Sequence, residues 1–122
     1  MLLAAFLFLC QGCASGPRFS GPIQLASNAK IVIVDATARR KPHGILVSGD
    51  VRRSDSYHGA VTGQLHVVGR DGSGNVVAAA DTPWGEFMSR RFRLAYFRVF
   101  LQTAAPSAIA IMSIEPVTQP TH

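Results

Sequence analysis

The sequence predicts an all-β fold, a single sandwich of about seven short strands, on the basis of three observations. Apolar and polar residues alternate with a period of two through most of the chain after residue 29, as they do in strands that bury one face. Turn-forming Gly, Pro, Asp and Asn residues recur about every ten residues. No segment after the apolar amino-terminal run shows the spacing of an amphipathic helix.

The first half of this domain should contain one short strand and two longer ones. Residues 23–26 form a weak first strand, and residues 30–36 are apolar at both parities. Such a segment is expected to be buried from both sides or to lie at a sheet centre. Residues 43–52 alternate cleanly instead, which predicts a half-buried strand with Ile45, Val47, Gly49 and Val51 inward.

The clearest local pattern is a hairpin between residues 60–70 and 76–80. The first of these strands should turn Val61, Gly63, Leu65 and Val67 inward. Residues 71–75, Asp-Gly-Ser-Gly-Asn, tolerate positive φ and therefore close the hairpin. Pro83 and Gly85 then end the sheet, and Trp84 between them is expected to pack across the end of the core.

Alternation resumes at residue 91, but the apolar parity changes between Tyr96 and Phe97. A β-bulge or a bend between sheets is predicted there. A final strand is expected at residues 107–114, and residues 116–122, with two prolines among them, are interpreted as a loose tail.

Length and composition suit one folded domain. The chain has 122 residues, of which 48% are hydrophobic and 16% charged, and this composition excludes a disordered chain. We place the domain at residues 23–115. Both cysteines, Cys10 and Cys13, precede it, so no disulfide framework is expected inside it.

The amino terminus has the features of an export signal. Residues 1–10 are almost wholly apolar and too short to span a bilayer, and residues 1–12 fit a signal peptide. Gly12-Cys13 resembles the bacterial lipobox, in which a small residue precedes a cysteine that receives diacylglycerol. Leu9, which precedes Cys10, is not small. The resemblance therefore implies lipidation at Cys13, followed by a flexible tether over residues 13–22 rich in Ser, Gly and Pro.

The lipobox resemblance also implies a location. An Asp directly after the lipidated cysteine signals retention in the inner membrane, and Ala14 stands there instead. The expected location is the outer membrane of the bacterial envelope, facing the periplasm. Two alternatives stay open: a plain signal peptide cut after Ala14 or Ser15, which gives a soluble periplasmic or secreted protein, and a buried core strand.

The strand count and spacing favour an immunoglobulin-like or fibronectin-type sandwich over a barrel. The order of features over residues 30–114 resembles small immunoglobulin-like domains of bacterial envelope proteins. Those features are the GILVSGDVRR strand, the QLHVVGRDGSGNVVA hairpin and the YFRVFLQ strand. The resemblance implies a fold and no activity.

The chain is basic, with a formal charge of +5, and its basic residues occur in clusters. Arg side chains suit bidentate contact with phosphate or carboxylate, so the clusters are candidate contacts for an envelope protein, an anionic lipid or a polysaccharide. They serve equally well to keep a small domain soluble and to protect edge strands. Nucleic acid is not expected as a partner after export. The candidates are Arg39, Arg40, Lys41, Arg52, Arg53, Arg90 and Arg91, with Arg93 and Arg98 near the last pair.

The sequence nominates no catalytic group, and no cofactor is expected. Nucleophile-elbow and phosphate-loop motifs are absent, as are His and Cys pairs at metal-ligand spacing. Our hypothesis is a non-catalytic envelope lipoprotein, a structural or protein-interaction module that accepts a partner strand at a sheet edge. The alternative is a periplasmic protein that binds a metal or small ligand through His43, His58 and neighbouring loops. His66 should point outward, and His122 ends the chain.

Overall fold

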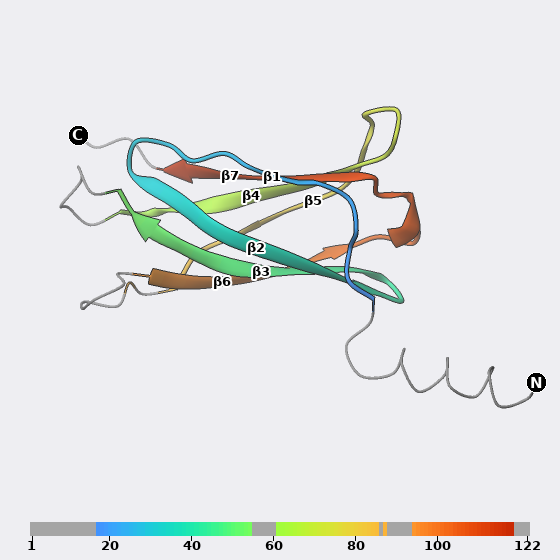
Figure 1. Ribbon diagram of the computed structural model, residues 1–122, viewed down its shortest axis with the longest axis horizontal. Helices are drawn as coiled ribbons and strands as arrows, with labels where there is room; N and C mark the ends of the chain where they lie inside the picture. The colour runs from blue at the N-terminus through green and yellow to red at the C-terminus, as the bar shows by residue number, and fades with distance from the viewer. Residues whose placement is uncertain (1–16, 55–60, 86, 88–93, 119–122) are drawn as a thin grey trace, which may run out of the picture.

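The computed structural model describes residues 17–54, 61–85, 87 and 94–118, which form two β-sheets packed face to face (Figure 1). One sheet has the strand order β1-β7-β4-β5 and the other β2-β3-β6. The prediction of an all-β sandwich of about seven strands is confirmed. Residues 1–12 and Cys13, the predicted signal peptide and lipidation site, lie outside the described residues. The strands are β1 (Ile23–Leu25), β2 (Ile31–Lys41), β3 (Gly44–Arg53), β4 (Gly63–Arg70), β5 (Val76–Thr82), β6 (Leu94–Gln102) and β7 (Ile111–Thr118), with one 3₁₀ turn, η1 (Pro106–Ala108).

The pairing of the strands differs from the predicted arrangement in two respects. β1 runs parallel to β7, so the sandwich is not antiparallel throughout. β2 and β3 are hairpin neighbours in one sheet, whereas the second and third strands of an immunoglobulin constant domain lie in opposite sheets. The immunoglobulin-like part of the prediction is therefore not confirmed.

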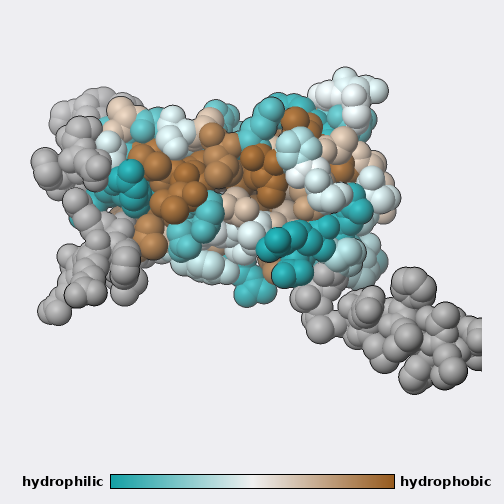
Figure 2. Space-filling view, viewed as in Figure 1, coloured by the Kyte–Doolittle hydropathy of each residue, from teal (hydrophilic) through white to brown (hydrophobic). Residues whose placement is uncertain are grey.

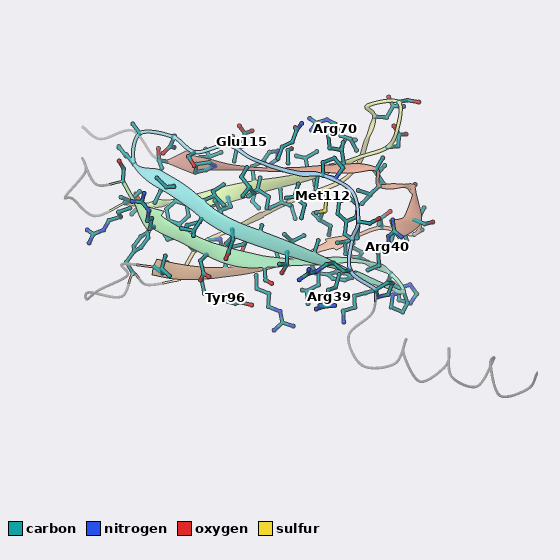
Figure 3. All side chains as sticks on the ribbon, viewed as in Figure 1. Arg39, Arg40, Arg70, Tyr96, Met112 and Glu115 are labelled. Atoms are coloured by element: carbon teal, nitrogen blue, oxygen red, sulfur yellow. The ribbon has the colours of Figure 1, made fainter. Side chains whose placement is uncertain are left out.

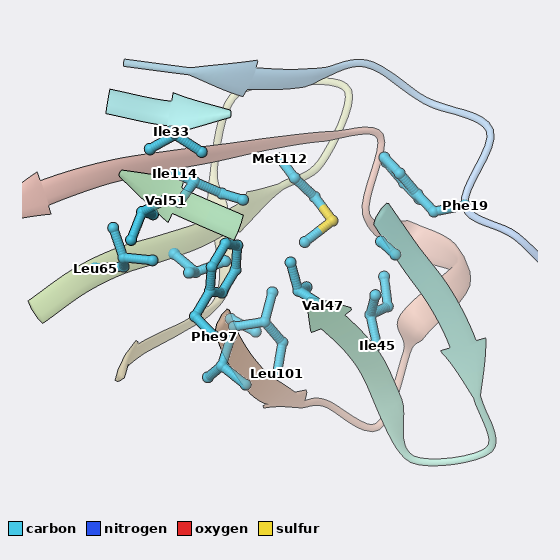
Figure 4. Packing of buried hydrophobic residues seen from close by; sticks show 14 of the residues in the cluster. Phe19, Ile33, Ile45, Val47, Val51, Leu65, Phe97, Leu101, Met112 and Ile114 are labelled. Carbon is cyan, nitrogen blue, oxygen red and sulfur yellow. The ribbon is translucent and has the colours of Figure 1, made fainter. Parts of the chain in front are cut away.

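The core lies between the two sheets and is built from the predicted inward parities of β3 and β4. Ile45, Val47 and Val51 are fully buried, as are Leu65 and Val67. Figure 4 shows the side chains of the two sheets meeting, with Met112 and Ile114 of β7 facing Phe97 and Leu101 of β6. Full burial of one such side chain stabilises the fold by roughly 1.5–3 kcal/mol.

β2 contradicts the expectation that residues 30–36 are buried from both sides. It is an edge strand, and Val34 is 45% exposed. The register shifts between Ile33 and Asp35, which marks a β-bulge. Before the bulge the odd-numbered residues, such as Ile33, face inward, and after it the even-numbered residues, such as Ala38, do. Gly49, paired with Ala36, lies just beyond the bulge, and any Cβ there would collide with the carbonyl oxygen of Asp35.

The bulge predicted between Tyr96 and Phe97 is wrong. β6 alternates without interruption from Leu94 to Gln102, and its pairing with β3 shows no register shift. Ala95 and Phe97 are buried while Tyr96 is 57% exposed. Tyr96 therefore belongs to the outer face of its sheet and not to the core.

The β4–β5 hairpin has the predicted turn. The Asp71 carboxylate accepts hydrogen bonds from the N–H groups of Ser73 (2.9 Å) and Asn75 (3.0 Å), and Gly74 adopts a φ of +90°. The backbone hydrogen bond from Asn75 is the main cause of a lowered pKa at Asp71. Trp84 packs against the core cluster beyond the end of β5, as predicted.

The carboxy-terminal prediction is shifted along the chain. Residues 106–108 form η1 instead of the start of a strand, and β7 continues to Thr118 through residues predicted as a loose tail. Pro116 is compatible with this strand because its nitrogen points away from β4, to the β1 side of β7. The N–H of Met112 donates to Pro22, on the β1 side of β7, and residue 116 has the same orientation. Its missing N–H therefore costs no bond to β4.

The predicted flexible tether over residues 13–22 is also too long. Phe19 is 5% exposed and belongs to the core cluster, and its N–H donates to the carbonyl of Ala38 (2.9 Å). The N–H of Arg40 donates to the carbonyl of Pro17 (2.8 Å). From residue 17 onward the chain is therefore part of the folded domain.

Candidate functional site

The cluster Arg39-Arg40-Lys41 lies at the hairpin end of β2 but does not act as one group. Arg39 and Lys41 share the outward parity of the strand. Arg40 lies on the opposite parity, and its guanidinium carbon is 5.9 Å from the centre of the Phe19 ring. Its Nε is buried without a hydrogen-bond partner among the described residues. Arg40 therefore packs on the inserted amino-terminal segment.

Arg52 and Arg53 lie at the other end of the same sheet. Arg53 pairs with Ile31, whereas Arg39 pairs with Leu46. The six residues from Leu46 to Arg52 along β3 correspond to about 20 Å. The structure therefore separates the two predicted clusters. Arg90 and Arg91, and Arg93 near them, lie outside the described residues.

The outer face of the β2-β3-β6 sheet also carries Arg18, a basic residue that the sequence reasoning missed. Arg18 forms an isolated antiparallel bridge with Arg39 and is exposed. Its position depends on the pairing of residues 17–19 with β2, and no local pattern signals that pairing. On β6 the outward residues are Tyr96, Arg98 and Phe100, of which Phe100 is 42% exposed. Figure 3 shows Arg39 and Tyr96 on this outer side.

The outer face of the larger sheet has a different polar character. As predicted, His66 points outward, and its Nδ1 lies 2.6 Å from a carboxylate oxygen of Asp81 on β5. On the other side His66 is paired with Glu115 of β7. Arg70 donates to the hydroxyl of Ser113 (3.3 Å). Figure 3 shows Arg70 and Glu115 on this side, opposite Arg39 and Tyr96.

The histidines do not come together in the described part of the chain. His43 is exposed in the turn between β2 and β3, and His66 lies on the larger sheet. His58 and His122 lie outside the described residues. Over residues 17–54, 61–85, 87 and 94–118, no group of three or more His, Cys, Asp or Glu side chains could hold a metal ion.

A pocket of about 590 Å³ lies at the end of the sandwich opposite His43. The Trp84 and Phe87 rings are 6.4 Å apart at an angle of 51°, and the Arg53 guanidinium carbon lies 5.6 Å from the Phe87 ring centre. Flat aromatic walls beside a cation suit a planar, anionic ligand. The remaining lining residues are Val61, Thr62, Gly63 and Gly85.

Two of the four sheet edges are covered in part by other segments of the chain. The β6 edge receives the Gly85 N–H on the carbonyl of Tyr96 (2.9 Å) and the Thr82 hydroxyl on the carbonyl of Arg98 (3.3 Å). The β2 edge is covered at one end by residues 17–19. At its other end the Ser27 hydroxyl accepts from the Ile33 N–H (3.1 Å).

β1 and β5 form the other two edges. β1 is only three residues long, and short edge strands resist pairing with another chain. Figure 2 shows a hydrophobic band on the side of the molecule where β1 and β2 face the viewer. The exposed residues of these strands include Leu25 and Val34.

β5 is the longer strand, and its outer edge is open along its first part. Successive residues of a strand point their N–H and C=O groups to opposite sides. The Met112 N–H donates to Pro22, which fixes this alternation in β7, and the registers of β7 with β4 and of β4 with β5 extend it to β5. The backbone N–H and C=O groups of Ala80 therefore point toward β4, and those of Ala79 point outward. Within the described residues, no backbone hydrogen bond outside the ladders involves Ala79. Residues 76–80 carry no charge, and Val76 is 57% exposed.

No helix among the described residues has the length and apolar character needed to cross a bilayer. Comparison of the chain with protein-family models, with curated protein sequences and with solved structures finds no match.

Proposed function

We propose that this chain is a non-catalytic lipoprotein of the bacterial envelope, and that its sandwich is an interaction module that accepts an extended strand of a partner protein along β5. The open edge at Ala79 carries this proposal. A free edge offers N–H and C=O groups at regular spacing, and pairing there needs no special side chains. The small, uncharged side chains of residues 76–80 leave room for an incoming strand.

The other edges support the choice of β5. Natural sheets protect an edge by covering it, shortening it or placing charges on it. β6 is covered in part, β2 is covered at both ends, and β1 is short, as described above. β5 lacks the first two protections, and its first charged residue is Asp81. An edge left open in this way is either an aggregation hazard or a contact surface.

The contact is tested by photo-cross-linking in the producing cells, with a benzophenone side chain at Val76. Ala79→Pro removes the outward N–H while leaving the Ala80 pairing with β4 in place, and Ala79→Ser is the matched control that keeps it. We expect a defined adduct whose yield falls at least about tenfold in the proline variant only. An adduct of undiminished yield in Ala79→Pro argues against pairing at this edge.

The anchor is tested separately by incorporation of labelled palmitate in a bacterial host, followed by separation of inner and outer membranes. We expect label in the outer-membrane fraction and its complete loss in Cys13→Ser. Cys10→Ser is the control, because Cys10 lies in the segment predicted to be removed. Label that persists in Cys13→Ser contradicts the assigned attachment point.

A second candidate function, binding of a small ligand, is favoured by the pocket at Trp84 and not by the histidines of the original alternative. His43 lies at the other end of β3, so the pocket and the histidine are separate features. Trp84 is the only tryptophan in the chain, so its fluorescence reports on this pocket alone. Titration with aromatic carboxylates should shift the emission if the pocket binds them, and Phe87→Ala should abolish the shift.

A further inference from the structure

The amino-terminal end of the folded chain and the β2–β3 hairpin form a corner with an unusual charge arrangement. The bridge between Arg18 and Arg39 is flanked by the hydrogen bonds from Phe19 to Ala38 and from Arg40 to Pro17. This pattern defines a non-hydrogen-bonded pair, whose Cα atoms are about 4.5 Å apart and whose side chains lie on the same face. Like charges directly opposite one another destabilise a sheet.

More positive charge lies close to this pair. Lys41 follows Arg39 on the same face of β2, and Arg98 lies on β6 in the adjacent row, opposite Ser48. We call Arg18, Arg39, Lys41 and Arg98 the basic corner. An anion placed over it would offset the repulsion between the two paired arginines.

The acidic residues of the same face lie away from the bridge. Asp35 and Asp50 are paired with each other, and the N–H of Asp50 donates to the Asp35 carboxylate (3.2 Å). Four residues along β3 separate Leu46, in the row of Arg39, from Asp50, a distance of about 13 Å. The two aspartates therefore lie between the basic corner and Arg52, which is on the same face at the other end of β3.

Apolar groups accompany the basic corner. Phe100 lies in the same row as Arg39, with Leu46 between them, whereas Tyr96 lies farther along the same face of β6, in the row of Asp50. Both aromatic side chains are more than 40% exposed. Aromatic and basic residues together are typical of surfaces that rest at the head-group level of a membrane.

The length of chain between the anchor and the corner completes the argument. Arg18 lies only five positions after Cys13. Five fully extended Cα–Cα steps span about 17 Å, and as a flexible coil about 13 Å. A lipid on Cys13 therefore keeps the basic corner within one or two Debye lengths, each about 8 Å, of the head groups.

We propose that the basic corner and Phe100 rest on the anionic phospholipid head groups of the leaflet that holds the Cys13 anchor, so that the outer face of the β2-β3-β6 sheet is turned toward the membrane. This inference rests on the lipid anchor of the proposed function and adds an orientation to it. The outer face of the larger sheet is turned toward the aqueous side.

The orientation is tested with the full-length chain, expressed, lipidated and reconstituted into phosphatidylcholine vesicles with or without phosphatidylglycerol. Cys13 is acylated and Cys10 is in the removed segment, so an added cysteine is the only free thiol of the mature protein. A fluorophore is placed on Thr37→Cys, on the proposed membrane face, or on Gln24→Cys, on the outer face of the larger sheet. Lipids with a nitroxide on the head group quench a fluorophore that lies against them.

We expect strong quenching at position 37 and weak quenching at position 24, only in vesicles with phosphatidylglycerol, and loss of the difference in high salt. A basic residue near an anionic leaflet changes the docked population about fivefold. Arg39→Gln should therefore lower the ratio of docked to undocked molecules about fivefold, and Arg18→Gln combined with it about 25-fold. Arg70→Gln, which removes the same charge from the opposite face, should leave the ratio unchanged.

The two proposals fail in distinguishable ways. An acylated, membrane-bound protein whose two labels are quenched equally, or whose docking persists on neutral vesicles, overturns the orientation and leaves the anchor in place. A chain that takes up no acyl group overturns the anchor and the orientation with it. Circular dichroism of each arginine variant verifies that its β-sheet content matches that of the parent.

Discussion

The inward and outward sides of β6 carry the same kind of side chain in opposite surroundings. Phe97 is 2% exposed and faces the core, whereas Phe100, three residues later, is 42% exposed beside the basic corner. Packing explains Phe97, because the core between the sheets must be filled. It does not explain Phe100 or Tyr96. The comparison separates what the fold requires from what it leaves available for contact.

The largest expected effect is on the inward side. Phe97→Ala should lower the free energy of unfolding by about 3–5 kcal/mol, because it leaves a cavity among Met112, Ile114 and Leu101. Phe100→Ala should cost no more than about 1 kcal/mol, because the side chain is already partly in water. Urea denaturation of both variants measures the contrast. Equal losses would mean that Phe100 has a structural role comparable to that of Phe97.

A smaller effect is expected where the inward parity of β2 changes. Gly49→Ala places a Cβ against the carbonyl oxygen of Asp35, so the bulge at Val34 must shift, at a cost of about 1–3 kcal/mol. Gly72→Ala is the matched control, because a Cβ there meets nothing within 4 Å. Urea denaturation again gives the free energies of unfolding. An unchanged stability of Gly49→Ala would mean that the two backbones can move apart at this position without cost.

The smallest effect concerns the turn of the β4–β5 hairpin and depends on pH. The pKa of Asp71 is lowered by hydrogen bonds that favour its ionised form, chiefly from the Asn75 backbone. A lowered folded-state pKa stabilises the protein above the unfolded-state pKa, about 3.9, and this contribution disappears as the pH falls through the folded-state value.

Asp71→Asn should therefore be less stable than the parent at neutral pH, and the difference should shrink below about pH 4. Thermal melts of the two proteins across this range provide the measurement, with Gly72→Ala as a control whose difference from the parent stays flat. A difference in stability that is independent of pH would mean that Asp71 stabilises the turn through the geometry of its hydrogen bonds and not through its charge.

Most of the strands were predictable because their inward and outward residues differ in polarity. β3, β4 and the turn at residues 71–75 lie where the alternation and the glycines place them. β2 was not predictable in this way, because residues 31–34 are apolar at both parities and conceal the bulge at Val34. In β6 the large apolar ring of Tyr96 suggests burial more strongly than the small side chain of Ala95, although Ala95 is the buried residue of the two.

The candidate surfaces were less predictable than the strands, because they depend on pairing between distant segments. The sequence singles out Arg39 and Lys41 but not Arg18, whose position follows from the bridge to β2. It groups Arg40 with them, although the register turns that side chain toward Phe19. That β5 is an open edge follows only from the strand order of both sheets. Periodicity within a segment contains no information about strand order.

The insertion of Phe19 beside β2 also determines how the domain responds to force. A pull on the chain before residue 17 is first resisted by the two backbone hydrogen bonds that flank Arg18 and by the buried Phe19 ring. Residues 17–21 can detach from β2 while Pro22 and β1 stay paired with β7, and this release lengthens the preceding segment by five residues, about 17 Å. The segment that precedes β1 therefore lengthens under load before the two sheets separate.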